Sequence, residues 1–209
     1  MPAFTETTNT FLDAVKSRRT YYQLNKDLGL LTRDEIQELV TETTLHTPSS
    51  YNSQSNRLLV LFGAEHDKLW DIVRDTLKAI VAPNSWQPTA DRIAGFRAAA
   101  GTILFFDDQE AIKKMQEQFP RYADNFPMFA TQSLAMQQYI LWATLETEGL
   151  GANLQHYSPL IDDKVAAEWD IPTSWKLNAQ LVFGGRAGDP GPKQFQDVEE
   201  RVRFFGPSI

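Results

Sequence analysis

The 209-residue sequence contains no cysteine. Disulfides, thiolate nucleophiles, cysteine-ligated zinc and iron–sulfur clusters are therefore excluded, and any redox chemistry must come from a bound cofactor. Histidine is scarce as well, because only His46, His66 and His156 are present, far apart and without a carboxylate at ligand spacing. A surface position or a satisfied hydrogen bond explains each histidine more simply than a metal enzyme does, so we expect no metal site.

Basic charge is also in short supply. The chain has 20 Lys and Arg residues against 27 Asp and Glu residues, a net charge of −7. This balance argues against nucleic acid and anionic membranes as partners. No apolar run reaches about 18 residues, and the N-terminus lacks the basic and then apolar layout of a secretion signal, so we expect a cytoplasmic protein. An apolar fraction of 42% allows a substantial core, and we expect one domain over residues 1–209.

Hydrophobic spacing predicts helices interleaved with buried strands, which is typical of a layered α/β domain. Asn9 or Thr10 is a candidate cap for the first helix, and a capping box of Thr32 and Glu35 opens the second. The helical pattern over 128–148 is too apolar for a surface helix, and we place it in the core. The predicted helices cover residues 9–17, 32–45, 69–80, 89–99, 128–148 and 162–169, with a further polar helix between residues 108 and 119, and the predicted strands cover residues 57–62, 102–106 and 177–183.

The C-terminal part begins with a segment rich in glycine and proline, residues 184–193. Such a composition does not form regular structure. The apolar residues 202–205 that follow are expected to form a strand at a sheet position distant from residue 183.

A polar loop over residues 45–56 stands between a helical and a strand-like run, and it concentrates Ser, Asn and Gln side chains. Rigid elements on both sides would let these side chains converge on a ligand. The other interpretation is a helix-to-strand turn, since Ser and Asn readily bond their own backbone. The residues of the loop alone leave both interpretations open.

Two further segments have the chemistry of a binding site. Arg18, Arg19 and Thr20 follow the first helix, whose dipole favours cations at its C-terminal end, and this commonly suffices to explain them. The alternative is a phosphate site, since guanidinium forks and a hydroxyl suit phosphate oxygens. The glycines in 149–153 permit close approach of backbone to a ligand. The chain has neither a phosphate-binding P-loop nor a dinucleotide-binding glycine fingerprint.

Four segments in this order resemble the nitroreductase family of FMN-dependent oxidoreductases, and the similarity extends from about Phe11 to Phe205. Arg18-Arg19-Thr20 is similar to the family's Arg-Arg-Ser, which implies contacts to the FMN phosphate and ribityl chain. The loop with Pro48, Ser49, Ser50, Asn52 and Gln54 resembles Pro-Ser-x-x-Asn-x-Gln, which implies that Asn52 bonds the flavin. Glu148, Gly149, Leu150 and Gly151 match a segment whose amides pass the flavin N5 edge. The 184–193 tail resembles a Gly-x-Pro ending, where Lys193 or Arg186 would close on the phosphate.

Two departures from the family pattern matter. Tyr22 stands where relatives often carry Lys or Arg near the flavin pyrimidine ring, and Gln54-Ser55-Asn56-Arg57 replaces the common Gln-Pro-Trp. The variants look like the short branch with fungal and copper-induced bacterial members. They leave open which group of the chain stabilises the reduced flavin.

The resemblance implies an α+β fold with a mostly antiparallel sheet flanked by helices, and a homodimer that exchanges C-terminal strands and builds its FMN sites at the subunit interface. It also implies hydride transfer from NAD(P)H through flavin N5 to nitroaromatic or quinone acceptors, for which the chain need supply no catalytic acid or base. The alternative is a flavin-binding regulatory or sequestering protein with little turnover. NADH or NADPH as donor, and the physiological acceptor, stay open.

Trp86, Phe126 and Phe129 are candidates for a substrate wall, because planar acceptors stack between aromatic rings and a flavin. Packing in the core or in a dimer is the other interpretation of these aromatic residues.

Overall fold

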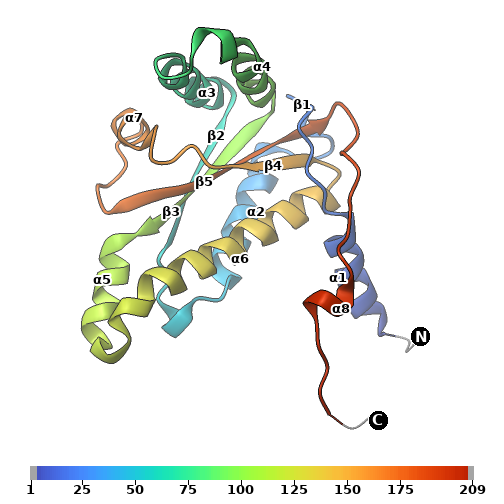
Figure 1. The fold of residues 1–209 in the computed structure, drawn as a ribbon, viewed down its shortest axis with the longest axis vertical. Coiled ribbons are helices and arrows are strands. Elements are labelled where there is room, and N and C mark those ends of the chain that lie inside the picture. The colour runs from blue at the N-terminus through green and yellow to red at the C-terminus, as the bar shows by residue number, and fades with distance from the viewer. Residues whose placement is uncertain (1–3, 207–209) are drawn as a thin grey trace.

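The computed structural model describes residues 4–206 as helices on both faces of a five-stranded sheet (Figure 1). The α-helices are α1 (Glu6–Ser17), α2 (Arg33–His46), α3 (Gly63–Lys78), α4 (Trp86–Arg97), α5 (Gln109–Gln118), α6 (Phe126–Thr147), α7 (Asp162–Glu168) and α8 (Val198–Arg201). The strands are β1 (Leu24–Asn25), β2 (Asn56–Phe62), β3 (Gly101–Asp108), β4 (Gly151–Gln155) and β5 (Trp175–Arg186), and short 3-10 helices occupy Ser50–Asn52, Pro83–Ser85 and Pro120–Asn125.

The sheet has the order β1-β5-β3-β2, and β4 also pairs with β5. All four strand pairings are antiparallel. Every residue of β3 is buried, since β3 lies between β2 and β5 with helices on both faces. The fold is therefore α+β with an antiparallel sheet, as the family resemblance implied.

Two core clusters lie on opposite faces of the sheet. On one face, Trp70 of α3 and Phe96 of α4 pack together with ring centroids 4.8 Å apart. On the other face, Leu134 and Leu141 of α6 and Ile36 of α2 are fully buried. Figure 1 shows α3 and α4 on one side of the sheet and the long α6 crossing the other. The placement of this helical segment in the core is confirmed, although one side of α6 stays exposed.

Most predicted elements are confirmed, and their ends differ for local reasons. The capping box of Thr32 and Glu35 is present. However, α1 begins at Glu6 because the Thr5 hydroxyl accepts the Thr8 N–H, so neither Asn9 nor Thr10 is the cap. Likewise α4 begins at Trp86 and contains Pro88, which the first turn tolerates because its N–H groups have no intrahelical partner.

The prediction for the glycine-rich tail was wrong at its start, whereas the exchange of the segment after it between two protomers stays a prediction. β5 continues through Gly184 and Gly185 to Arg186, because β4 and β1 offer strand partners there. In contrast, residues 202–205 form no strand within this chain, and Phe204 and Phe205 are 89% and 92% exposed. Figure 1 shows this segment leading away from the sheet.

Within residues 4–206, no helix combines the length and apolar character needed to cross a membrane.

Candidate functional site

A basic pocket lies where the segment after α1 meets the C-terminal tail. It has a volume of about 250 Å³ and contains three cationic side chains. Guanidinium and ammonium groups at this density favour an anion such as a phosphate. The residues that line the basic pocket are Arg18, Arg19, Thr20, Tyr22, Gly191, Pro192 and Lys193. The structure thus brings the first and the last of the predicted binding segments together.

Contacts with α6 and the tail hold the two arginines in place. The guanidinium of Arg18 stacks on Trp142, 4.5 Å from the ring centroid. The Trp142 indole N–H donates to the carbonyl of Arg19 at 3.2 Å, and the Arg19 N–H donates to the carboxylate of Glu146 at 2.6 Å. The Arg19 side chain also donates to the carbonyl of Gly191, which ties the tail to this segment.

Arg186, the other basic candidate of the tail, does not line the basic pocket. Its guanidinium donates to the carbonyls of Glu146 and Leu150 at 3.0–3.1 Å and lies over the ring of Tyr21. Burial raises the pKa of Glu146, and the N–H of Arg19 and the charge of Arg186 oppose this rise. Arg186 therefore satisfies carbonyls at and just after the C-terminal end of α6, and Lys193 is the tail cation that lines the basic pocket.

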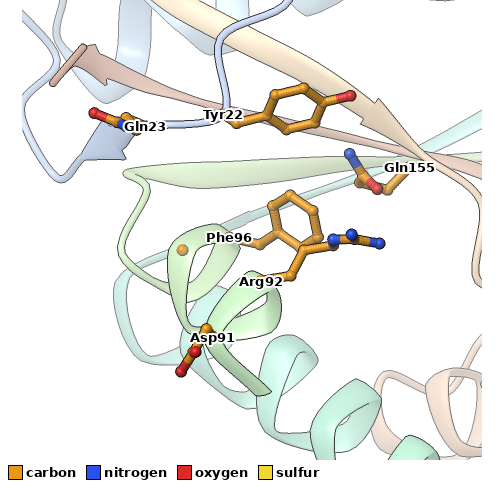
Figure 2. A pocket seen from close by; sticks show the side chains of 7 residues that line it. Tyr22, Gln23, Asp91, Arg92, Phe96 and Gln155 are labelled. Atoms are coloured by element: carbon orange, nitrogen blue, oxygen red, sulfur yellow. The ribbon is translucent and has the colours of Figure 1, made fainter. Parts of the chain in front are cut away.

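A second and larger pocket, here the α4 pocket, shares Tyr22 with the basic pocket and has a volume of about 570 Å³. Figure 2 shows Tyr22 on one side of it and Arg92 and Phe96 of α4 on the other. Its lining combines two aromatic rings with amide and charged side chains, as a planar polar ligand requires. The lining residues are Tyr22, Gln23, Asp91, Arg92, Gly95, Phe96 and Gln155.

Strand β4 supplies the amide on the far wall of the α4 pocket. The side chain of Gln155 donates to the Asn153 carboxamide oxygen at 2.8 Å, and the buried Asn153 donates to the carbonyl of Tyr21 at 2.8 Å. This chain of bonds fixes Gln155 relative to the segment that carries Tyr22. The sequence analysis missed Gln155, although the alternation of a strand places it on the same face as Asn153.

Residues 148–151 line neither of these two pockets, and the expectation that their amides pass a ligand stays a prediction. The N–H groups of residues 148–150 donate to carbonyls in the last turn of α6. A side chain at Gly151 would come within 3.0 Å of Tyr21 and Leu24, so this glycine permits close packing of the chain on itself. Only the end of β4, at Gln155, reaches the α4 pocket.

The part of the polar loop around Tyr51 lies at the N-terminal end of α6, whereas Pro48 lies beside Tyr139 and Ile140 in the C-terminal half of the helix. Tyr51 of the loop packs on Phe126 with ring centroids 5.4 Å apart, whereas Arg18 packs on Trp142. A helix rises 1.5 Å per residue, so these two contacts are separated by about 24 Å along α6. Within one chain the basic pocket is lined by none of the predicted loop residues Pro48, Ser49, Ser50, Asn52 and Gln54.

The loop has a strained backbone. Tyr51, Asn52 and Gln54 have φ values of 56°, 51° and 48°, in the left-handed region that residues other than glycine rarely adopt. The hydroxyl of Ser49 accepts the N–H of Gln54 at 3.0 Å and helps to hold this shape. Strained residues of this kind cluster at binding sites, but Asn also adopts this conformation in turns, so both interpretations of the loop stay open.

The aromatic candidates for a substrate wall line neither pocket. Phe126 is 2% exposed and packs on Phe119 and on Phe129 with centroids 6.1 and 5.7 Å apart. Trp86 packs on the core cluster that covers the α3 and α4 face. Within the described chain these residues have packing roles.

The histidines show no metal-binding arrangement. His66 is fully buried, and its Nδ1 lies 2.9 Å from the hydroxyl of Thr102. His46 and His156 are exposed. No group of three or more potential His, Asp or Glu ligands occurs in the part of the chain that the structure describes.

The antiparallel sheet between helix layers is shared with solved nitroreductases, so the chain has the α+β nitroreductase fold. The chain belongs to the nitroreductase family, whose model matches residues 15–185. HBN1 of Saccharomyces cerevisiae is 40% identical over 91% of this chain and 96% of its own length, and nitroreductase FRM2 of the same organism is 34% identical over 90% and 94%. The structure of the nitroreductase CinD from Lactococcus lactis with nicotinic acid matches with a TM-score of 0.87 and 44% identity over 94% of this chain and all of CinD.

Proposed function

We propose that this protein is an FMN-dependent oxidoreductase that passes hydride from NAD(P)H to nitroaromatic or quinone acceptors. The observation that supports the proposal is the pair of pockets that share Tyr22, one basic and one wide enough for a planar ring system. FMN has this composition, a dianionic phosphate joined by a ribityl chain to a flat tricyclic ring.

The residues present fit FMN. Arg18 and Arg19 offer guanidinium forks for phosphate oxygens, and Lys193 adds a third positive charge. Thr20 adds a hydroxyl to the same pocket. In the α4 pocket, Gln155 offers an amide that can donate or accept at the ring edge.

When bound, FMN supplies hydride acceptance and donation at N5. The chain's part is then to hold the phosphate, orient the ring and exclude water. No protein acid or base is needed, and neither pocket contains histidine or a pair of carboxylates. The preference for aromatic acceptors draws support from CinD, which has been crystallised with nicotinic acid, chloramphenicol and 4-nitrophenol.

The split site supports a homodimer in which each FMN site takes its basic pocket from one protomer and its polar loop from the other. Met136 and Tyr139, on the outer face of α6, are 42% and 37% exposed, and an apolar hollow beside Pro48 runs along this face. Phe204 and Phe205 are exposed at the end of the tail. Apolar surface of this extent favours association, and we propose that α6 and the exchanged C-terminal segments form the interface.

Reconstitution of the apoprotein with FMN tests the proposal. The complex should be yellow, and nitroaromatics or quinones should stimulate its oxidation of NADH or NADPH. Arg18→Ala removes a charge-assisted fork that is typically worth about 1.5–3 kcal/mol and should weaken FMN binding accordingly. Lys193→Ala should weaken it less, because a flexible ammonium is a less specific partner.

Arg186→Ala is the matched control, because Arg186 is a tail cation that contacts the carbonyls of Glu146 and Leu150 and not the pocket. It should lower stability more than FMN affinity. A protein that binds FMN but shows no acceptor-stimulated turnover would be the regulatory or sequestering alternative. A protein that binds no FMN would contradict the proposal altogether.

A further inference from the structure

We propose that Arg92 is the cation that stabilises the reduced, anionic form of FMN in this protein. The inference rests on the proposed function and assigns a residue to the role that the sequence leaves open, since Tyr22 stands where a cation is expected. A tyrosine hydroxyl, with a pKa near 10, carries no positive charge at any pH. The positive charge must therefore come from another element of the chain.

Arg92 is the one basic side chain among the residues that line the α4 pocket. It lies in the middle of α4, on the turn before Gly95 and Phe96. Figure 2 shows its guanidinium on the same side of the pocket as the ring of Phe96, with Tyr22 and Gln155 opposite. A ring system that extends from the basic pocket past Tyr22 would enter this space.

The guanidinium of Arg92 is available to a ligand. Arg92 is exposed and has no ion pair or side-chain hydrogen bond within residues 4–206. Arg97, one turn further along α4, instead pairs with Asp67 and Asp71 at 3.4 and 3.1 Å. The adjacent carboxylate of Asp91 accepts from Gln87 at 2.7 Å, and Figure 2 shows it pointing away from Arg92.

The positive field of Arg92 already acts on its surroundings. Burial raises the pKa of Tyr157, and the charge of Arg92 opposes that rise. Gly95 leaves open space beside Arg92, because a Cβ there would come no nearer than 4.0 Å to its closest neighbour, the carbonyl of Tyr22. The pocket thus combines a free cation with room for a flat ligand.

Reduction of a flavin by two electrons leaves negative charge at the pyrimidine end of the ring. A fixed cation at that end stabilises the reduced form more than the oxidised form, and the effect grows as water is excluded from the pocket. Arg92 should therefore raise the reduction potential of bound FMN and contribute less to the affinity for oxidised FMN.

The test compares FMN-loaded wild-type protein with Arg92→Ala, Arg92→Lys and Tyr22→Phe by redox titration, together with the affinity for oxidised FMN. Arg92→Ala should weaken binding of reduced FMN about tenfold more than binding of oxidised FMN, which lowers the two-electron potential by about 30 mV. Arg92→Lys should restore most of this shift. Lys113→Ala, which removes an exposed charge from α5 outside both pockets, should leave the potential unchanged.

An unchanged potential in Arg92→Ala would overturn the inference, and so would a shift that appears in Tyr22→Phe instead. Gly95→Leu gives a second readout, because its side chain would occupy the α4 pocket without interrupting the helix. It should weaken FMN binding at least tenfold, and unchanged binding would place the ring elsewhere and overturn the inference. A wild-type protein that binds no FMN would instead overturn the proposed function, and this inference with it.

Discussion

Asp107, at the end of β3, carries a buried carboxylate oxygen without a hydrogen-bond partner among the described residues. Burial raises its pKa from 3.8 to about 6, against a smaller opposing effect of Lys176. The folded chain therefore binds more protons than the unfolded chain between about pH 4 and 6, and the associated stability is lost as the pH rises through that window.

His66 has the opposite effect on stability. Burial lowers its pKa from 6.5 to about 4, so its neutral form is favoured in the folded state. Stability linked to His66 is present above pH 6.5 and is lost as the pH falls towards 4. Between pH 4 and 6, the effects of Asp107 and His66 on the pH dependence of stability have opposite signs and largely cancel.

Replacement of Asp107 by Asn should remove the Asp107 contribution to the pH dependence of stability and leave that of His66. We expect the free energy of unfolding to rise by about 1–2 kcal/mol at pH 7, because no charge is then buried at that position. The variant should also lose stability more steeply than the wild type between pH 6 and 4, since His66 then acts alone. Urea unfolding at pH 4.5, 5.5 and 7 measures both effects. Asp124→Asn, at an exposed position, is the control, and a loss of stability at pH 7 in Asp107→Asn would refute the assignment.

At the scale of elements, the N-terminal end of α6 has its own small core. Phe126, Ala130 and Ile112 are buried there, and Phe126 also supports Tyr51 of the strained loop. We expect Phe126→Ala to lower stability by about 3 kcal/mol, as large-to-small substitutions in cores do. Phe195→Ala is the control, because this ring is 76% exposed.

Thermal unfolding and steady-state kinetics of the two variants distinguish packing from substrate contact. If Phe126→Ala changes the Michaelis constant for nitroaromatics and keeps its melting temperature, Phe126 contacts the substrate. If only the melting temperature falls, Phe126 has a packing role.

Elements with strong local signals could be predicted from the sequence, and those that depend on neighbours could not. The Thr32 and Glu35 side chains cap their own helix, so four residues of sequence were sufficient. Gly184 and Gly185 have no strand propensity, and only pairing with β4 and β1 makes them part of β5. Segment 202–205 has a strand-like sequence but no partner strand in its own chain.

The candidate site divides in the same way. Arg18, Arg19 and Thr20 are adjacent in sequence, so their grouping made an anion site one of two open interpretations, and the structure places all three in the basic pocket. Arg92 gives no such signal, because it reaches the α4 pocket only when the sheet brings α4 opposite Tyr22. Arg92 and Tyr22 are distant in sequence, so their proximity can be seen only in the folded structure.

For the whole molecule, the tail is the segment that we assign to the proposed dimer interface. We expect deletion of residues 199–209 to cost dimerisation and FMN binding together, because it removes the exposed apolar end that we assign to the interface. Light scattering and FMN stoichiometry measure the two properties. A truncated chain that stays dimeric with full FMN would rule out the exchange of C-terminal segments.

Mixed dimers provide the sharper test of the split site. Arg18→Ala damages the basic pocket and Asn52→Ala damages the loop, so each homodimer should bind FMN poorly. A mixed dimer would have one intact site and one site with both defects. Random association of equal amounts should therefore restore about a quarter of the wild-type FMN capacity. If pocket and loop act within one chain, mixing will restore nothing.

The 22 residues of α6 lie between the contact of Arg18 at one end and the contact of the strained loop at the other. The length of α6 therefore sets the distance between the basic pocket and that part of the loop. Insertion of one residue near its middle would shift one half by about 1.5 Å and rotate it by about 100° relative to the other. Gln137 accepts a hydrogen bond from Asn56 of β2, and Gln138 donates one to Asn178 of β5. The rotation would move one or both side chains away from these partners. The length of α6 should therefore vary far less among related chains than the lengths of the surface loops, even where its exposed side chains change freely.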